Sequence, residues 1–267
     1  MRRTTLAALC IAAATATVLT GCRSGSSDSS DGASRTAGTN ASPAAKEKEK
    51  KEKEPFAGLT GGQIADRALT ATTGASSLRL RGDVPDDESG GTITLDVALD
   101  KKGECAGSLS MNGQGRADLI KTGDTIYMKY DEAFLRAQSK GESKDTADAV
   151  VTMLAGKWTK TSATGKDAMD ISGFCDLDTV LGGADEGSSA ATRGRTTTVD
   201  GTPAIVLTEQ DGKDRYTVYV ATQGEPYLLR IDSASAGDPG TLAFSDYEKP
   251  VPAQKPSGKI LDLDELG

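Results

Sequence analysis

Apolar and polar residues alternate along much of the chain after residue 77. The segment 93–99 is the clearest case, because its odd-numbered residues are Ile, Leu or Val and its even-numbered residues are Thr, Asp and Ala. A period of two places successive side chains on opposite faces of a β-strand, and turn residues such as Asn112-Gly113 separate the segments. The pattern predicts about ten antiparallel strands with one apolar and one polar face. Their expected ranges are 78–84, 93–99, 105–111, 115–121, 124–130, 193–199, 203–209, 214–220, 226–232 and 240–247.

A helical period appears before the first strand and between the two runs of strands. Thr60 and Gln63 have the spacing of a capping box, and the helix they begin is expected to end at Gly74. Within 131–182, a short helix is expected from Asp131, and a further turn over 176–181. Between them, the apolar face of another helix is marked by Ala147, Val150, Val151 and Leu154, and Gly156 ends it. We expect this helical insertion to lie across the apolar face of the sheet as a lid.

The first 21 residues have the order of a secretory signal peptide. Arg2 and Arg3 precede an uncharged, Ala-rich run that is too short to remain as a membrane-spanning helix. Leu19-Thr20-Gly21-Cys22 resembles the bacterial lipobox, in which the cysteine becomes the first residue of the mature protein and carries a diacylglyceryl group. The resemblance implies attachment through Cys22 to the outer face of the cytoplasmic membrane. Arg2-Arg3 leaves both the general and the twin-arginine export routes open.

Residues 22–54 are expected to be a disordered tether. The segment contains Ser, Gly, Ala, Thr and Asp without large apolar residues, and it ends in a mixed-charge run of Lys and Glu. Treated as a flexible coil, it would span about 30 Å. The globular part is expected at 55–256, which is long enough to bury a sizeable core. We expect 257–267 to be a disordered acidic tail.

The charge of the mature chain narrows the class of partner. With Arg2 and Arg3 removed from the 31 basic residues, 29 remain against 39 acidic ones, a net charge of about −10. An acidic chain without a basic cluster indicates that nucleic acid is not a partner. The chain has no His, which excludes Ser-His-Asp and Cys-His catalysis and HExxH zinc sites. Acidic pairs such as Asp176 and Asp178 leave acid–base chemistry open, but such residues are usually solvated turns, so we expect neither an enzyme nor a cofactor.

Two cysteines remain in the globular part, Cys105 and Cys175. In an exported protein such a pair favours a structural disulfide. The alternative is a redox or metal-binding pair. The sequence offers no CxxC motif and no His to support that alternative.

The layout of an N-terminal helix, strands, a helical insertion and further strands resembles the LolA-like superfamily, and within it actinobacterial lipoproteins of the LppX/LprG type. The resemblance rests on Cys22, Gly201-Thr202-Pro203-Ala204, the stretch 216–232 and Phe244-Ser245-Asp246-Tyr247, and covers roughly 56–256. It implies an α+β fold, an unclosed antiparallel half-barrel whose apolar concave face and helical lid enclose acyl chains. No catalytic motif comes with the family.

Two hypotheses of function follow. In the first, the anchored domain binds a lipid or another apolar ligand between sheet and lid, and lipid transport in the envelope is the role this binding would serve. Its lining would include Leu95, Val97, Leu109, Met111, Met128, Val150, Val151, Leu154 and Trp158. Alternation reports burial and not a cavity, so these residues are also compatible with a closed core. In the second hypothesis the domain is a tethered interaction or sensor module, which binds an envelope protein through an exposed apolar patch and has no cavity.

Overall fold

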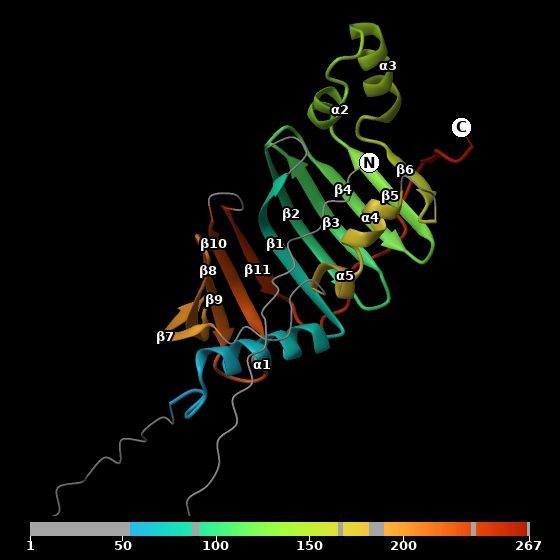
Figure 1. Cartoon of the computed structure of the whole chain (residues 1–267). Helices are drawn as coiled ribbons and strands as arrows, with labels where there is room; N and C mark the ends of the chain where they lie inside the picture. Colours follow the sequence, from blue (N-terminus) through green and yellow to red (C-terminus); the bar gives the residue numbers. More distant parts are fainter. Residues whose placement is uncertain (1–53, 87–90, 165–167, 182–189, 236–238, 266–267) are drawn as a thin grey trace, which may run out of the picture.

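The alternating segments form strands, and the strands join into one sheet. The computed structural model of the chain describes residues 54–86, 91–164, 168–181, 190–235 and 239–265. Figure 1 shows a large, open sheet with helices at one end and over one face. The strands are β1 (Ser77–Asp86), β2 (Gly91–Asp100), β3 (Cys105–Met111), β4 (Ala117–Thr122), β5 (Thr125–Tyr130), β6 (Trp158–Ser162), β7 (Thr192–Val199), β8 (Thr202–Asp211), β9 (Asp214–Ala221), β10 (Leu228–Ala234), β11 (Pro239–Ser245) and β12 (Ile260–Asp262). The helices are α1 (Gly61–Gly74), α2 (Glu132–Gln138), α3 (Lys144–Leu154), α4 (Met169–Phe174) and α5 (Leu177–Leu181).

The sheet is open, because its order runs from β12 at one edge to β7 at the other. The full order is β12-β6-β5-β4-β3-β2-β1-β11-β10-β9-β8-β7. Neighbouring strands are antiparallel except for β12 and β6, which are parallel. The predicted α+β class with an unclosed antiparallel sheet is therefore confirmed, with two short strands, β6 and β12, beyond those expected.

The sheet has a seam where β1 pairs with β11, and Figure 1 shows its two halves set at an angle there. Gly82 lies on this seam with a φ of 157°, and a Cβ at this position would collide with the carbonyl oxygen of Thr241. Only glycine tolerates such a close approach of two backbones. Gly82 therefore permits the bend that turns the apolar side of both halves inward.

One face of the sheet, here called the convex face, is polar. Asp96 on β2 accepts hydrogen bonds from the Nε atoms of Arg79 at 2.6 Å and Arg81 at 3.1 Å. Asp118 on β4 pairs in the same way with Arg116 and with Lys129. Surface ion pairs of this kind typically contribute only about 0–1 kcal/mol each. Their position confirms that polar residues of the alternating strands face water on one side.

The opposite, concave face carries the core. Its largest fully buried side chains come from both halves of the sheet and from α1 and α5, and include Ile64, Leu78, Leu99, Leu119, Leu177, Ile205 and Val220. The predicted capping box is present at the start of α1, where Thr60 Oγ1 accepts from the Gln63 backbone N–H and Gln63 Oε1 accepts from the Thr60 backbone N–H. Burying one such Leu or Ile side chain contributes about 1.5–3 kcal/mol.

Three expectations are corrected by the structure. Trp158 does not lie at the end of a lid helix; it begins β6, because the chain reverses at Gly156 and continues as an alternating Trp-Thr-Lys-Thr-Ser strand. The acidic tail does not fray throughout, since Ile260–Asp262 pairs with the edge strand β6 and Asp262 forms an ion pair with Lys160. Finally, the predicted insertion covers the apolar face in part: α4 and α5 lie over it together with α1, α2 reaches the core through Phe134, and α3 stands beyond the end of the sheet (Figure 1).

Candidate functional site: the concave face

The register of the strands aligns apolar residues in rows across the concave face. One row joins Leu80 on β1, Val97 on β2 and, beyond Gly107, Leu119 on β4 and Met128 on β5. Directly paired residues in an antiparallel sheet share a face, so these side chains lie side by side. The row forms a continuous apolar wall over the five strands β1 to β5.

Burial changes along this wall from one end to the other. At the end beside α1 and α5, here called the near end, Leu78, Leu99 and Cys105 form a row that is no more than 1% exposed. At the opposite, far end, the residues of the concave face are only partly buried. This far group comprises Leu95, Leu109, Met111, Ile231 and Leu242. The protein's own helices therefore cover the near end fully and the far end incompletely.

The cover at the near end is held by a disulfide. Cys105 on β3 is bonded to Cys175, which directly follows α4, with the two Cα atoms 5.3 Å apart. The predicted pairing of these two cysteines is thus confirmed. Beside it, Leu177 on α5 is fully buried, and Asp176 caps α5 by accepting a 2.7 Å hydrogen bond from the Thr179 backbone N–H. The α4–α5 segment is consequently fixed to the sheet at this end.

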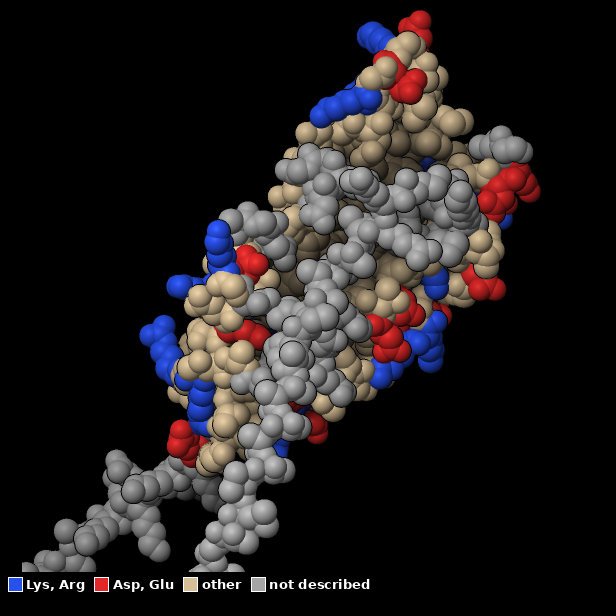
Figure 2. Space-filling model, viewed as in Figure 1, with Lys and Arg blue, Asp and Glu red and all other residues tan. Residues whose placement is uncertain are grey.

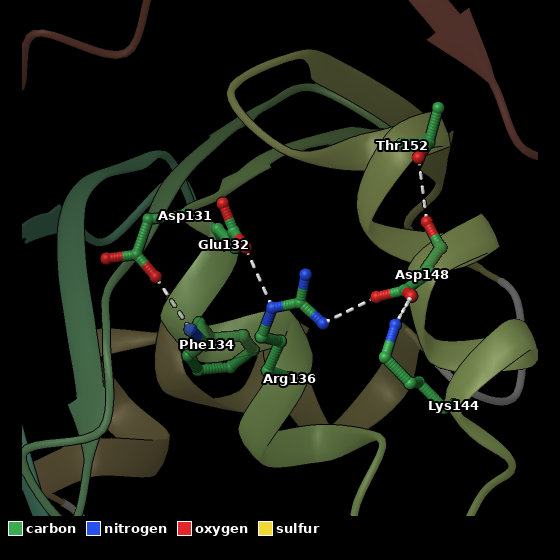
Figure 3. Close-up of polar contacts among 7 residues, drawn as sticks. All are labelled: Asp131, Glu132, Phe134, Arg136, Lys144, Asp148 and Thr152. Atoms are coloured by element: carbon green, nitrogen blue, oxygen red, sulfur yellow. Dashed lines mark hydrogen bonds and ion pairs between the residues drawn. The ribbon is translucent and has the colours of Figure 1, made fainter.

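The far end is bordered by a helical hairpin of α2 and α3, shown in Figure 3. Asp131 caps α2 by accepting from the Phe134 backbone N–H at 2.7 Å. Arg136 bridges the two helices, since its Nε donates to Glu132 at 2.7 Å and its Nη1 donates to Asp148 on α3 at 2.8 Å. Hydrogen bonds from this guanidinium and from Lys144 hold the pKa of Asp148 below its usual range, with the Lys144 bond the stronger cause. No residue of α3 is buried, so polar contacts hold α3 to α2.

The rows described on the concave face consist mainly of apolar residues. Figure 2 shows Lys, Arg, Asp and Glu side chains mainly toward the outline of the molecule in this view. Tyr130 at the far end of β5 stacks on Phe134 of α2, with ring centroids 5.5 Å apart. Burial raises the pKa of the Tyr130 phenol, so this hydroxyl is neutral at physiological pH. The apolar rows on this face suit an apolar ligand better than a charged one.

The predicted lining residues divide into two groups. The structure brings together Leu95, Val97, Leu109, Met111 and Met128 on the concave face. The remaining candidates are not among them. Val150, Val151 and Leu154 lie on the half-exposed α3, and Trp158 lies on the convex face, where Lys129 Nζ sits 4.9 Å from the ring centroid. Cys22 lies outside the described residues.

Sequence reasoning missed the contribution of the second half of the sheet to this wall. Ile231 pairs with Leu242, and Leu242 pairs with Gly82, next to Leu95. Both residues belong to predicted strands, but alternation alone does not reveal which strands become neighbours. The stacking of Tyr130 on Phe134 was also missed. The sequence signal for it was the short separation of these two aromatic residues along the chain, at the end of β5.

Other kinds of site are not apparent in the described ranges. Over these residues, no group of three or more His, Cys, Asp or Glu side chains is placed to hold a metal ion. Within the same ranges, no helix is both long and apolar enough to cross a membrane.

Comparison with known proteins yields structural similarity only. No family model matches the sequence, and no curated protein matches it. Among solved structures, LprF from Mycobacterium bovis is similar with 14% identity and a TM-score of 0.50, over 74% of this chain and 97% of LprF. The lipoprotein LppX from Mycobacterium tuberculosis is similar with 16% identity and a TM-score of 0.47, over 72% of this chain and 97% of LppX. At such identities the likeness to LprF carries the fold alone. The predicted resemblance is confirmed at that level: the chain has a fold similar to that of LprF.

Proposed function

We propose that the protein is a lipoprotein, anchored through Cys22 at the outer face of the cytoplasmic membrane, that binds a lipid or other apolar ligand on its concave face. The observation that carries this proposal is the incompletely covered far end. Leu95, Leu109 and Met111 remain partly exposed there on an otherwise buried apolar wall. In a closed core these side chains would be covered by the protein's own helices, so their exposure supports a bound apolar molecule as the missing cover.

The fold supports the proposal without identifying the ligand. An open sheet can widen between its halves to admit a ligand, whereas a filled two-layer core cannot do so without losing packing. The apolar rows of the wall favour acyl chains over polar molecules. We propose no catalytic step and no cofactor, because binding of this kind needs neither.

A matched pair of variants tests this function. Leu109 and Ser110 are adjacent on β3, both half-buried, and their side chains lie on opposite faces. In the soluble mature chain (residues 23–267), Leu109→Gln should weaken binding of cis-parinaric acid, a fluorescent fatty acid, by about tenfold, since burying an unpaired amide costs roughly 1–3 kcal/mol. Ser110→Gln should leave the affinity within about twofold. Equal affinities of the Leu109→Gln and Ser110→Gln variants for the fatty acid would contradict the proposal.

A specific observation favours the second candidate, an interaction module that binds an envelope protein. Met153 on α3 is 45% exposed and Phe174 at the end of α4 is 56% exposed, both unusually high for large apolar side chains. This candidate predicts that the soluble chain binds no fatty acid at all. It also predicts that Met153→Ser and Phe174→Ser abolish capture of an envelope protein, which the ligand-binding function does not require.

A further inference from the structure

The disulfide and the burial pattern together restrict how a ligand can reach the concave face. Resting on the proposed function, we infer that the ligand enters and leaves at the far end, through a portal between α2 and the Met111 end of β3. The near end is a permanently closed base. The first support is the difference in burial between the two ends of the concave face. Residues of the near row are no more than 1% exposed, whereas every residue of the far group is partly exposed.

The near end cannot open without breaking the core. Cys175 ties the α4–α5 segment covalently to β3, and Leu177 is completely buried beside it. The backbone adds a parallel bridge between Asp100 at the end of β2 and Asp176. Separating α5 from the sheet here would expose the fully buried Leu177 and Leu99 to water and would still leave the covalent bond intact. The lid is thus fixed where the core is most tightly packed.

The far end has no covalent tie of this kind: α2 is held there by the buried side chains of Phe134 and Leu135 and by polar contacts at the rim. The α2–α3 hairpin leaves the sheet after Tyr130 and returns to the same point, where the Gly156 backbone N–H donates to the Tyr130 carbonyl oxygen at 2.8 Å. Two exposed side-chain contacts join α2 and the residues after it to the rim. Lys140 Nζ donates to Gln114 Oε1 at 2.7 Å, and Gln138 Nε2 lies 3.3 Å from Met111 Sδ. Exposed bonds of this kind exchange readily with water.

The hairpin can therefore move as a unit about its attachment at Tyr130. Its two helices are joined to each other through Arg136 and Asp148, so tilting the hairpin need not separate α2 from α3. The hinge lies beside Phe134, whose ring stacks on Tyr130 and closes the apolar wall at this end. Motion there would break the contact between Gln138 and Met111 and leave the near row packed. A single entrance opposite a covalently closed base follows from this division.

A bulky label at each end tests the portal. Gln138 is exposed at the far end, and Lys102 is exposed in the turn between β2 and β3 at the near end. In the soluble mature chain, Cys105 and Cys175 are bonded to each other, so Gln138→Cys or Lys102→Cys introduces a single reactive thiol. Each variant is coupled to a polyethylene glycol maleimide and compared with its own unlabelled form, which removes any effect of the substitution itself. The readouts are the initial rate of cis-parinaric acid uptake and the amount bound at equilibrium.

The label at Gln138→Cys should slow uptake about tenfold and leave the final amount bound unchanged, because it obstructs the path and not the wall. The label at Lys102→Cys should change the rate by less than about twofold. Equal rates with and without the label at Gln138→Cys, or a larger effect at Lys102→Cys, would overturn the portal while leaving the proposed function standing. If unlabelled wild-type chain takes up no probe, the proposed function fails and the portal fails with it.

Discussion

Replacing both Cys105 and Cys175 by Ala should destabilise the protein strongly. The disulfide joins residues 70 apart in the sequence. In the chain-entropy description, closing a loop of that length stabilises the folded state by about 4.4 kcal/mol at room temperature, because it restricts the unfolded chain. For a chain of this size that loss corresponds to a fall in Tm of roughly 10–15 °C. The same substitution also frees the α4–α5 segment, so its backbone amides should exchange with solvent faster than those of the sheet.

Denaturant unfolding of the soluble mature chain measures this loss. The two single variants, Cys105→Ala and Cys175→Ala, are the matched controls: each removes the cross-link, so each should lose as much stability as the double variant. The m-value should rise in all three variants, since an unfolded chain without a cross-link exposes more surface. A loss below about 1 kcal/mol, or single losses that add up to the double, would refute the view that the bond clamps the lid to β3.

Three further outcomes are expected from other parts of the fold. At Gly107 a Cβ would collide with the Asp96 carbonyl oxygen, so Gly107→Ala should cost about 1–3 kcal/mol in denaturant unfolding. Gly74→Ala, where a Cβ meets nothing within 4 Å, should be neutral or stabilising; equal losses would contradict this reading. Arg193 donates to the carbonyl oxygens of Phe56 at 2.8 Å and Pro55 at 2.6 Å, so Arg193→Met should speed proteolytic cleavage near residue 55, and an unchanged rate would exclude such a clamp. The hydrogen bond from Arg79 lowers the pKa of Asp96, so the stability from this pair is complete above the ordinary pKa of Asp and is lost as pH falls through the lowered pKa. Asp96→Asn should reduce the loss of stability measured between about pH 6 and pH 2, and an identical acid profile would argue against the pair.

The fold was predictable where local periodicity decides it. Residues 93–99 alternate between large apolar side chains and polar or small ones, and the structure places them on β2 with Leu95, Val97 and Leu99 toward the concave face. The disulfide was predictable for a different reason, because Cys105 and Cys175 are the two cysteines of the globular part and therefore have one pairing available. Alternation is a property of a few neighbouring residues, and the number of cysteines is a property of composition. Neither prediction therefore required knowledge of which strands are neighbours.

What the sequence did not reveal depends on long-range pairing. Strand β12 consists of three residues and exists only because β6 offers an unpaired edge about a hundred residues earlier. The apolar spacing of Val150, Val151 and Leu154 correctly indicates a helix, yet it does not say which surface the helix meets, and α3 packs on α2 beyond the sheet. The candidate site was therefore predictable strand by strand on the first half of the sheet. The contribution of Leu242 and Ile231 required the register of the second half.

The most direct test of the central claim is the lipid content of the purified protein. The soluble mature chain, secreted from an actinobacterial host and purified without detergent, is extracted with organic solvent, and the extract is analysed by mass spectrometry. The account predicts a bound lipid in a fixed molar ratio to the folded protein, and a much smaller amount in the Leu109→Gln variant than in Ser110→Gln. Extracts that repeatedly contain no lipid, taken from protein with intact secondary structure and an intact Cys105–Cys175 bond, would contradict it.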